Sequence, residues 1–73
     1  MKTNEIIKEI LTVNNLSQEK LAAILCVSQK AVSNWLNGCD TPNASSMLMI
    51  YNNFGITPNE LLGLEEPTNF KQK

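Results

Sequence analysis

The chain has 73 residues, 42% of them apolar, and a formal charge of −1 from six lysines and seven acidic residues, with neither arginine nor histidine. This length fits one small domain, and no apolar run approaches the roughly 20 residues that span a bilayer, so we expect a soluble, cytoplasmic protein without membrane contact. Cys26 and Cys39, without a secretory signal pattern or a histidine, fit neither a disulfide framework nor a zinc site. We therefore expect no cofactor and no metal.

The first third of the chain is predicted to form two helices. The first covers residues 3–13, with Thr3 or Asn4 as its cap. Its apolar face has residues at helical spacing, namely Ile6, Ile7, Ile10 and Leu11. The second covers residues 18–25, and Ser17 is its cap. Its inward face consists of Leu21, Ala22 and Leu25.

A third helix is predicted directly after a tight turn at Cys26-Val27. It covers residues 29–37, because Ser28 is suited to cap it and Gly38 to end it in the left-handed conformation. Its inward residues recur at spacings of three and four and are Val32, Trp35 and Leu36. Two short helices joined by such a turn cross at a steep angle.

A fourth helix is predicted over residues 44–53 and a fifth directly after it. The expected core face of the fourth consists of Met47, Ile50, Tyr51 and Phe54. Thr57 and Glu60 form a capping box with Pro58 at the first helical position, which is a clear start for the fifth helix. Gly63 ends it after little more than one turn.

No strand-like alternation of apolar and polar residues is present, so we predict an all-α fold. The fifth helix is expected to be anchored by Leu61 and Leu62. One domain would span residues 1–64, and residues 65–73 would form a polar, flexible tail.

The third helix has a polar side opposite its apolar one, formed by Gln29, Lys30, Ser33, Asn34 and Asn37. The amides of Gln29 and Asn34 can pair with adenine N6 and N7, and Lys30 can reach guanine or a phosphate. Ser33 can contact most bases. A helix that packs by one side and carries such groups on the other is suited to the major groove of DNA. The same side chains could equally form an ordinary solvated helix face.

These residues resemble the XRE family of helix-turn-helix domains, which includes phage repressors and Cro proteins. The resemblance covers residues 16–63 and rests on Ser17, Gln18, Leu21, Ala22, Leu25, Val27, Ser28, Val32, Ser33, Trp35, Gly38, Pro42, Ile50, Phe54, Gly55 and the ending Glu60-Leu61-Leu62-Gly63. It implies a five-helix bundle of the lambda-repressor-like type. It also implies base reading by Gln29, Lys30, Ser33 and Asn34, and a phosphate contact by Gln18. We add Ser17 and Asn37 as candidate phosphate contacts.

Several positions depart from the family pattern. Cys26 stands where the family usually has glycine at the helix exit. Leu36 and Met49 replace charged residues, which would add exposed apolar surface. Tyr51 stands where a small residue is typical. Arginine is absent from the reading helix, which argues against tight or guanine-rich recognition. With a net charge of −1, phosphate-driven, salt-sensitive affinity should be weak for one subunit.

The interpretation that follows from the resemblance is a sequence-specific DNA-binding transcriptional regulator, a repressor rather than an enzyme. A homodimer is expected, with a palindromic operator whose half-sites are ~34 Å apart. The surface through which the two copies pair would include the fifth helix, Leu64 and Phe70. The activity of the regulator would be controlled through its concentration or by a protein antagonist. The alternative is a helix-turn-helix fold used as a protein–protein adaptor with weak or no DNA binding. That alternative draws on the acidic charge, the missing arginines, Leu36 and Met49.

Overall fold

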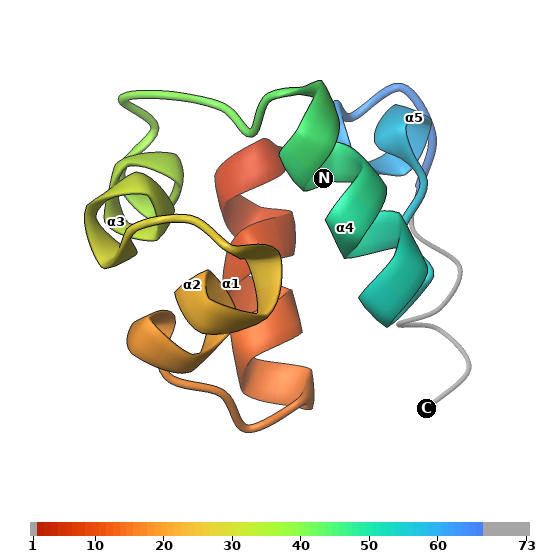
Figure 1. The fold of residues 1–73 in the computed structure, drawn as a ribbon. Coiled ribbons are helices and arrows are strands. Elements are labelled where there is room, and N and C mark those ends of the chain that lie inside the picture. Colours follow the sequence, from red (N-terminus) through yellow and green to blue (C-terminus); the bar gives the residue numbers. More distant parts are fainter. Residues whose placement is uncertain (1, 67–73) are drawn as a thin grey trace.

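The computed structural model describes residues 2–66. In this part of the chain all regular secondary structure is α-helical, as predicted. It contains five helices: α1 (Thr3–Val13), α2 (Gln18–Leu25), α3 (Gln29–Asn37), α4 (Ala44–Phe54) and α5 (Pro58–Leu61). Figure 1 shows α1 in the middle of the bundle, α3 at one side, and α4 and α5 toward the other. None of these helices is long and apolar enough to cross a membrane.

Short polar side chains fix the starts of α2, α3, α4 and α5. The Oγ of Ser17 accepts the backbone N–H of Lys20 at 3.0 Å, and the other three caps are Ser28, Asn43 and Thr57. The box predicted at the start of α5 is present, because the Glu60 carboxylate in return accepts the Thr57 N–H at 2.8 Å. These contacts satisfy amides that have no partner within their own helix.

The cap predicted for α1 is wrong. Lys2 occupies the N-cap position, and its backbone N–H donates to the Glu5 carboxylate at 2.7 Å. The Thr3 hydroxyl instead donates to the backbone carbonyl of Leu61 at 2.9 Å. A hydrogen bond between residues so far apart in sequence is set by tertiary packing, and local spacing could not predict it.

The core joins α1, α2 and α3 to the C-terminal pair of helices. It consists of Ile6, Ile7, Ile10, Leu21, Ala22, Leu25, Val32, Trp35, Ile50, Ile56 and Leu61. Burying such side chains is the main stabilising term for a domain of this size. All the inward residues predicted for α2 belong to this core.

The core face of α4 differs from the prediction. Ser46 and Ile50 are its buried residues, whereas the Tyr51 side chain is 49% exposed. Ser46 and Ile50 lie four residues apart and share one side of the helix, and Tyr51 is turned about 100° away from Ile50. Leu62, which was expected to anchor α5, is exposed, whereas Leu61 and the loop residue Ile56 are buried in the core.

Leu36 and Met49 do not add the exposed surface that we expected. Both are partly buried and pack against the core cluster. The departures from the family pattern at these two positions therefore contribute to packing.

Cys26 adopts the left-handed conformation at the end of α2, with a φ of 59°, and its side chain is exposed. A Cβ in this conformation costs about 1–2 kcal/mol, which glycine avoids. We expect Cys26→Gly to raise the free energy of unfolding by about 1 kcal/mol, and Tm by roughly 4–8 °C, in thermal unfolding followed by circular dichroism. Cys26→Ala is the control, because it removes the thiol but keeps the strained Cβ. A lower Tm for Cys26→Gly would show that the thiol stabilises the turn.

Candidate nucleic-acid interface

The helix pair α2–α3 is held at a fixed angle by its turn and its buried contacts. The Val27 N–H donates to the Ala22 carbonyl at 3.0 Å, which closes the end of α2. Ala22 and Val32 both lie in the buried core. A small residue such as alanine lets two crossing helices approach closely, so α3 leaves the turn in a defined direction.

The buried side of α3 determines which side chains face solvent. Val32 and Trp35 are 0% and 4% exposed, and they fix the rotation of the helix about its axis. Gln29 and Lys30 are exposed at its start, and Ser33 and Asn34 are half-buried beside the core-facing stripe. The structure thus brings the four predicted base-reading residues together on the first half and middle of one helix.

The polar groups of these four side chains do not stabilise the described part of the chain through hydrogen bonds. Within residues 2–66, Gln29, Lys30, Ser33 and Asn34 make no side-chain hydrogen bond to the protein. Ser28, by contrast, uses its Oγ to accept the Ala31 N–H at 3.1 Å. The amide and hydroxyl groups of the polar side therefore remain available to an external partner.

The three predicted phosphate contacts lie in two places. Ser17 and Gln18 are at the start of α2, where the helix presents its free amides. The Ser17 oxygen accepts the Lys20 N–H, so its hydroxyl proton is still available for a phosphate oxygen. Asn37 is exposed at the other end of α3, eight residues beyond Gln29, which corresponds to roughly 12 Å along the helix. It shares the stripe of Lys30 and Ser33 and does not join the Ser17–Gln18 pair.

Charge is distributed unevenly between the two ends of the domain. Residues 17–38 contain two lysines and one glutamate, a net charge of +1. Residues 39–66 contain one aspartate, three glutamates and no lysine, a net charge of −4. A polyanion is therefore attracted to the α2–α3 end and repelled from most of the α4–α5 end. In the described part of the chain, no cluster of three His, Cys, Asp or Glu side chains is placed to hold a metal ion.

One surface feature escaped the sequence prediction. The exposed large apolar side chains of the described residues are Leu48, Tyr51, Leu62 and Leu64, all from α4 onward. The signal was present as apolar residues at positions 44, 47, 48 and 51, a helical stripe that we had assigned in part to the core. Leu64, a candidate for the dimer surface, is exposed, and the other candidate, Phe70, lies outside the described residues.

Known helix-turn-helix proteins resemble this chain in sequence. A family model described as a helix-turn-helix domain matches residues 4–67. The chain is similar to the HTH-type transcriptional activator BcrR of Enterococcus faecalis, with 42% identity over 66 residues. The match covers 90% of this chain and 32% of that protein, so the chain spans about a third of its curated relative. No solved structure matches the chain significantly.

The Ser28 cap makes the start of α3 open to a direct test. We expect Ser28→Ala to lower the free energy of unfolding by about 1 kcal/mol, because the Ala31 N–H loses its acceptor. Ser28→Thr, which keeps the hydroxyl, should remain close to the wild-type Tm in the same thermal melt. Equal loss in both variants would show that another feature of Ser28 stabilises the helix.

Proposed function

Because the chain belongs to the helix-turn-helix domain family, as its XRE-type residues indicated, we propose that it binds double-stranded DNA within a transcriptional regulator. In this proposal α3 enters the major groove and reads sequence, and the start of α2 contacts the backbone. The relative named as a transcriptional activator supports a role in transcription.

One observation carries the proposal: α3 is buried on one side, and the polar side chains on its other side make no hydrogen bond to the described residues. Val32 and Trp35 attach it to the core, while the side chains of Gln29, Lys30 and Asn34 have no hydrogen-bond partner among residues 2–66. A polar helix side can serve solubility alone, but in this proposal the two amides, Gln29 and Asn34, reach base edges. Amides that donate and accept together suit adenine in the major groove.

The remaining contacts fix register rather than sequence. Ser17, Gln18 and Asn37 would bind phosphate oxygens on either side of the groove, and Ser33 would contact a base beside Gln29. Such phosphate contacts orient a protein on the duplex without choosing a sequence. Lys30 would bind guanine O6 and N7, or a phosphate.

One copy of the domain has few positively charged side chains with which to bind phosphate. With Lys20 and Lys30 as the lysines of the α2–α3 unit, phosphate binding by one copy is weak. We propose that two copies bind together on a palindromic operator, with half-sites ~34 Å apart. The relative is named an activator, so the repressor role stays a prediction, as does control by a protein antagonist.

The adaptor alternative has lost part of its basis. It drew on Leu36 and Met49 as exposed apolar surface, and both pack against the core. The acidic charge and the absence of arginine still favour it. The two functions differ in how binding responds to salt.

The first test is selection of random DNA duplexes by the 73-residue chain at low salt, followed by sequencing. We expect an enriched palindrome, and against that sequence Gln29→Ala and Asn34→Ala should each relax the preference at one base position. Each substitution should weaken the binding free energy for DNA with the preferred base by about 1–3 kcal/mol. Asn52→Ala, which removes an exposed amide from α4, is the matched control and should leave the preference unchanged. Equal loss on all sequences would contradict base reading by these amides.

Salt dependence separates DNA reading from adaptor binding. The logarithm of the DNA affinity should fall linearly with the logarithm of salt concentration, because bound cations are released from the duplex. If Lys30 contacts a phosphate, Lys30→Gln should reduce this slope by about 1. Lys8→Gln removes the same charge from the exposed side of α1 and should leave the slope unchanged. A folded protein that selects no DNA sequence and shows no salt-dependent DNA binding would favour the adaptor function.

A further inference from the structure

The last residue of α3 is an asparagine followed by glycine, and this pair of residues has a reactivity of its own. No other asparagine of the sequence precedes a glycine. The Asn37 side chain is exposed, and within residues 2–66 it makes no hydrogen bond. Asparagine is one of the thermolabile side chains, because the backbone nitrogen of the next residue can attack its amide carbon. Glycine at that next position favours the attack, since it has no Cβ to hinder it.

We propose that Asn37 is a site of spontaneous deamidation. The Gly38 nitrogen attacks Cγ of Asn37 and forms a new C–N bond. The bond between Cγ and Nδ2 breaks, and Nδ2 leaves as ammonia together with the proton of the Gly38 amide. The product is a five-membered succinimide ring, which water opens at either carbonyl to give aspartate or isoaspartate. The reaction consumes one water molecule and requires no oxidant, metal or cofactor.

The surroundings of Gly38 leave room for this ring. Apart from the adjoining backbone, no heavy atom of the described residues lies within 4 Å of the place where a Cβ of residue 38 would stand. Gly38 is also exposed, so water can reach the succinimide. Figure 1 shows the connection from α3 to α4 at the outside of the bundle. Neither ring closure nor ring opening therefore requires the core to move.

The folded end of α3 slows the reaction. The Gly38 N–H donates to the Trp35 carbonyl at 3.2 Å, and the Cys39 N–H donates to the Asn34 carbonyl at 2.9 Å. Ring closure requires the Asn37 backbone to rotate out of its helical conformation, which breaks both hydrogen bonds. Such bonds contribute modestly to stability, and chain segments with few buried contacts open more readily than the core. Deamidation therefore proceeds from the frayed last turn of α3.

Deamidation changes the charge of the proposed DNA-binding surface. This consequence rests on the proposed function, in which Asn37 binds a phosphate oxygen. The new carboxylate lowers the net charge of residues 17–38 from +1 to zero and repels the phosphate. A negative charge at the C-terminus of a helix also opposes the helix dipole, so the last turn of α3 becomes less stable. An aged copy of the chain therefore binds DNA more weakly than a new one.

The modification is tested by peptide mass spectrometry of the 73-residue chain after incubation in mildly alkaline buffer below its Tm. We expect a mass gain of nearly one dalton at Asn37 and two products, aspartate and isoaspartate, that separate by chromatography. The chain unfolded in guanidinium chloride should react roughly 10- to 100-fold faster, because the two hydrogen bonds that close the end of α3 are then absent.

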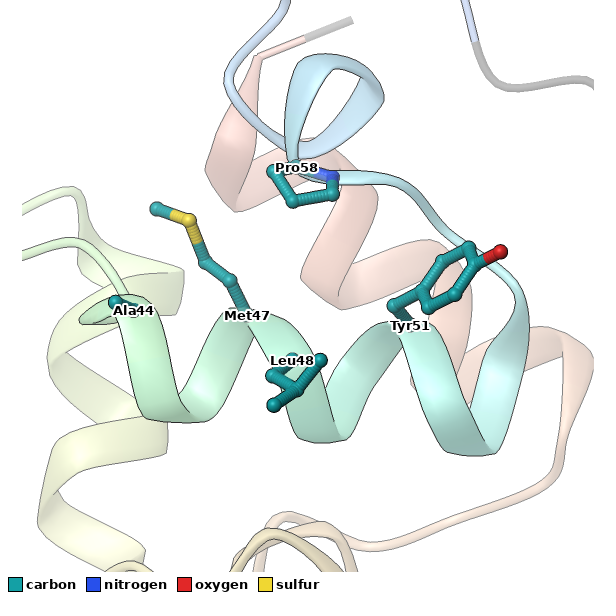
Figure 2. Close-up of a pocket in the computed structure, with 5 residues that line it drawn as sticks. All are labelled: Ala44, Met47, Leu48, Tyr51 and Pro58. Carbon is teal, nitrogen blue, oxygen red and sulfur yellow. The ribbon is translucent and has the colours of Figure 1, made fainter.

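Asn52 is the internal control for this measurement. It is exposed on α4, directly after Tyr51, which lines the apolar pocket between α4 and the start of α5 (Figure 2). It is followed by asparagine rather than glycine, so it should keep its mass over the time in which Asn37 reacts. Asn37→Gln is the matched variant, because it keeps an amide whose cyclisation would require a six-membered ring. This variant should gain no mass at residue 37.

Three results would overturn the proposal. The first is an unchanged Asn37 in the folded chain after roughly 100 half-lives of the same reaction in the unfolded chain. The second is aspartate without isoaspartate, because direct hydrolysis of the side-chain amide gives aspartate alone. The third is an equal rate at Asn52, which would show that the glycine after Asn37 has no part in the reaction.

The effect on DNA binding is measured with the duplex that random selection enriches. At low salt Asn37→Asp should bind at least about threefold more weakly than Asn37→Ala, which removes the phosphate contact without adding charge. Asn52→Asp adds the same charge on α4 and should bind like the wild type. Equal losses in the two aspartate variants would contradict a local effect at α3. A chain that selects no DNA would refute the proposed function, whereas the mass measurement would still decide whether Asn37 is modified.

Discussion

The burial of Val32 and Trp35 is the constraint on which the rest of the site depends. These two side chains attach α3 to α1 and α2 and so fix both its position and its rotation. Rotation matters because a shift of one residue turns a helix by about 100°. Such a shift would bury Ser33 in one direction or Asn34 in the other, and it would expose core residues to water. The free energy of packing the core therefore also holds the polar side in its outward orientation.

The helix boundaries, and with them the buried and solvent-facing sides of α3, were predictable from sequence because they depend on local chemistry. Ser17, Ser28 and Thr57 each accept an amide three residues on, and such contacts can be read from residue types at fixed spacing. The left-handed conformation of Cys26 at the end of α2 had a different source, because only the resemblance to a family with glycine at this position suggested it. Which side chains touch DNA remains a prediction, because the chain alone contains no base.

The predictions that were wrong concern residues at which segments far apart in the sequence come into contact. Tyr51 has the composition and spacing of a core residue, yet α4 packs through Ser46 and Ile50. Nothing in the local sequence shows that the polar Ser46 and the loop residue Ile56 are buried, or that Leu62 is exposed. Thr3 was expected to cap its own helix and instead reaches Leu61. Each of these depends on the relative placement of helices, which periodicity does not determine.

The hydrogen bond from Thr3 to the Leu61 carbonyl has a consequence for how the domain opens. A four-residue helix such as α5 is not stable alone in water, so it depends on contacts with the rest of the domain. This bond joins it to the first turn of α1, 58 residues earlier in the chain. Fraying of the N-terminal turn breaks this bond and removes one of the contacts that hold α5, so opening at one end of the described chain favours opening at the other.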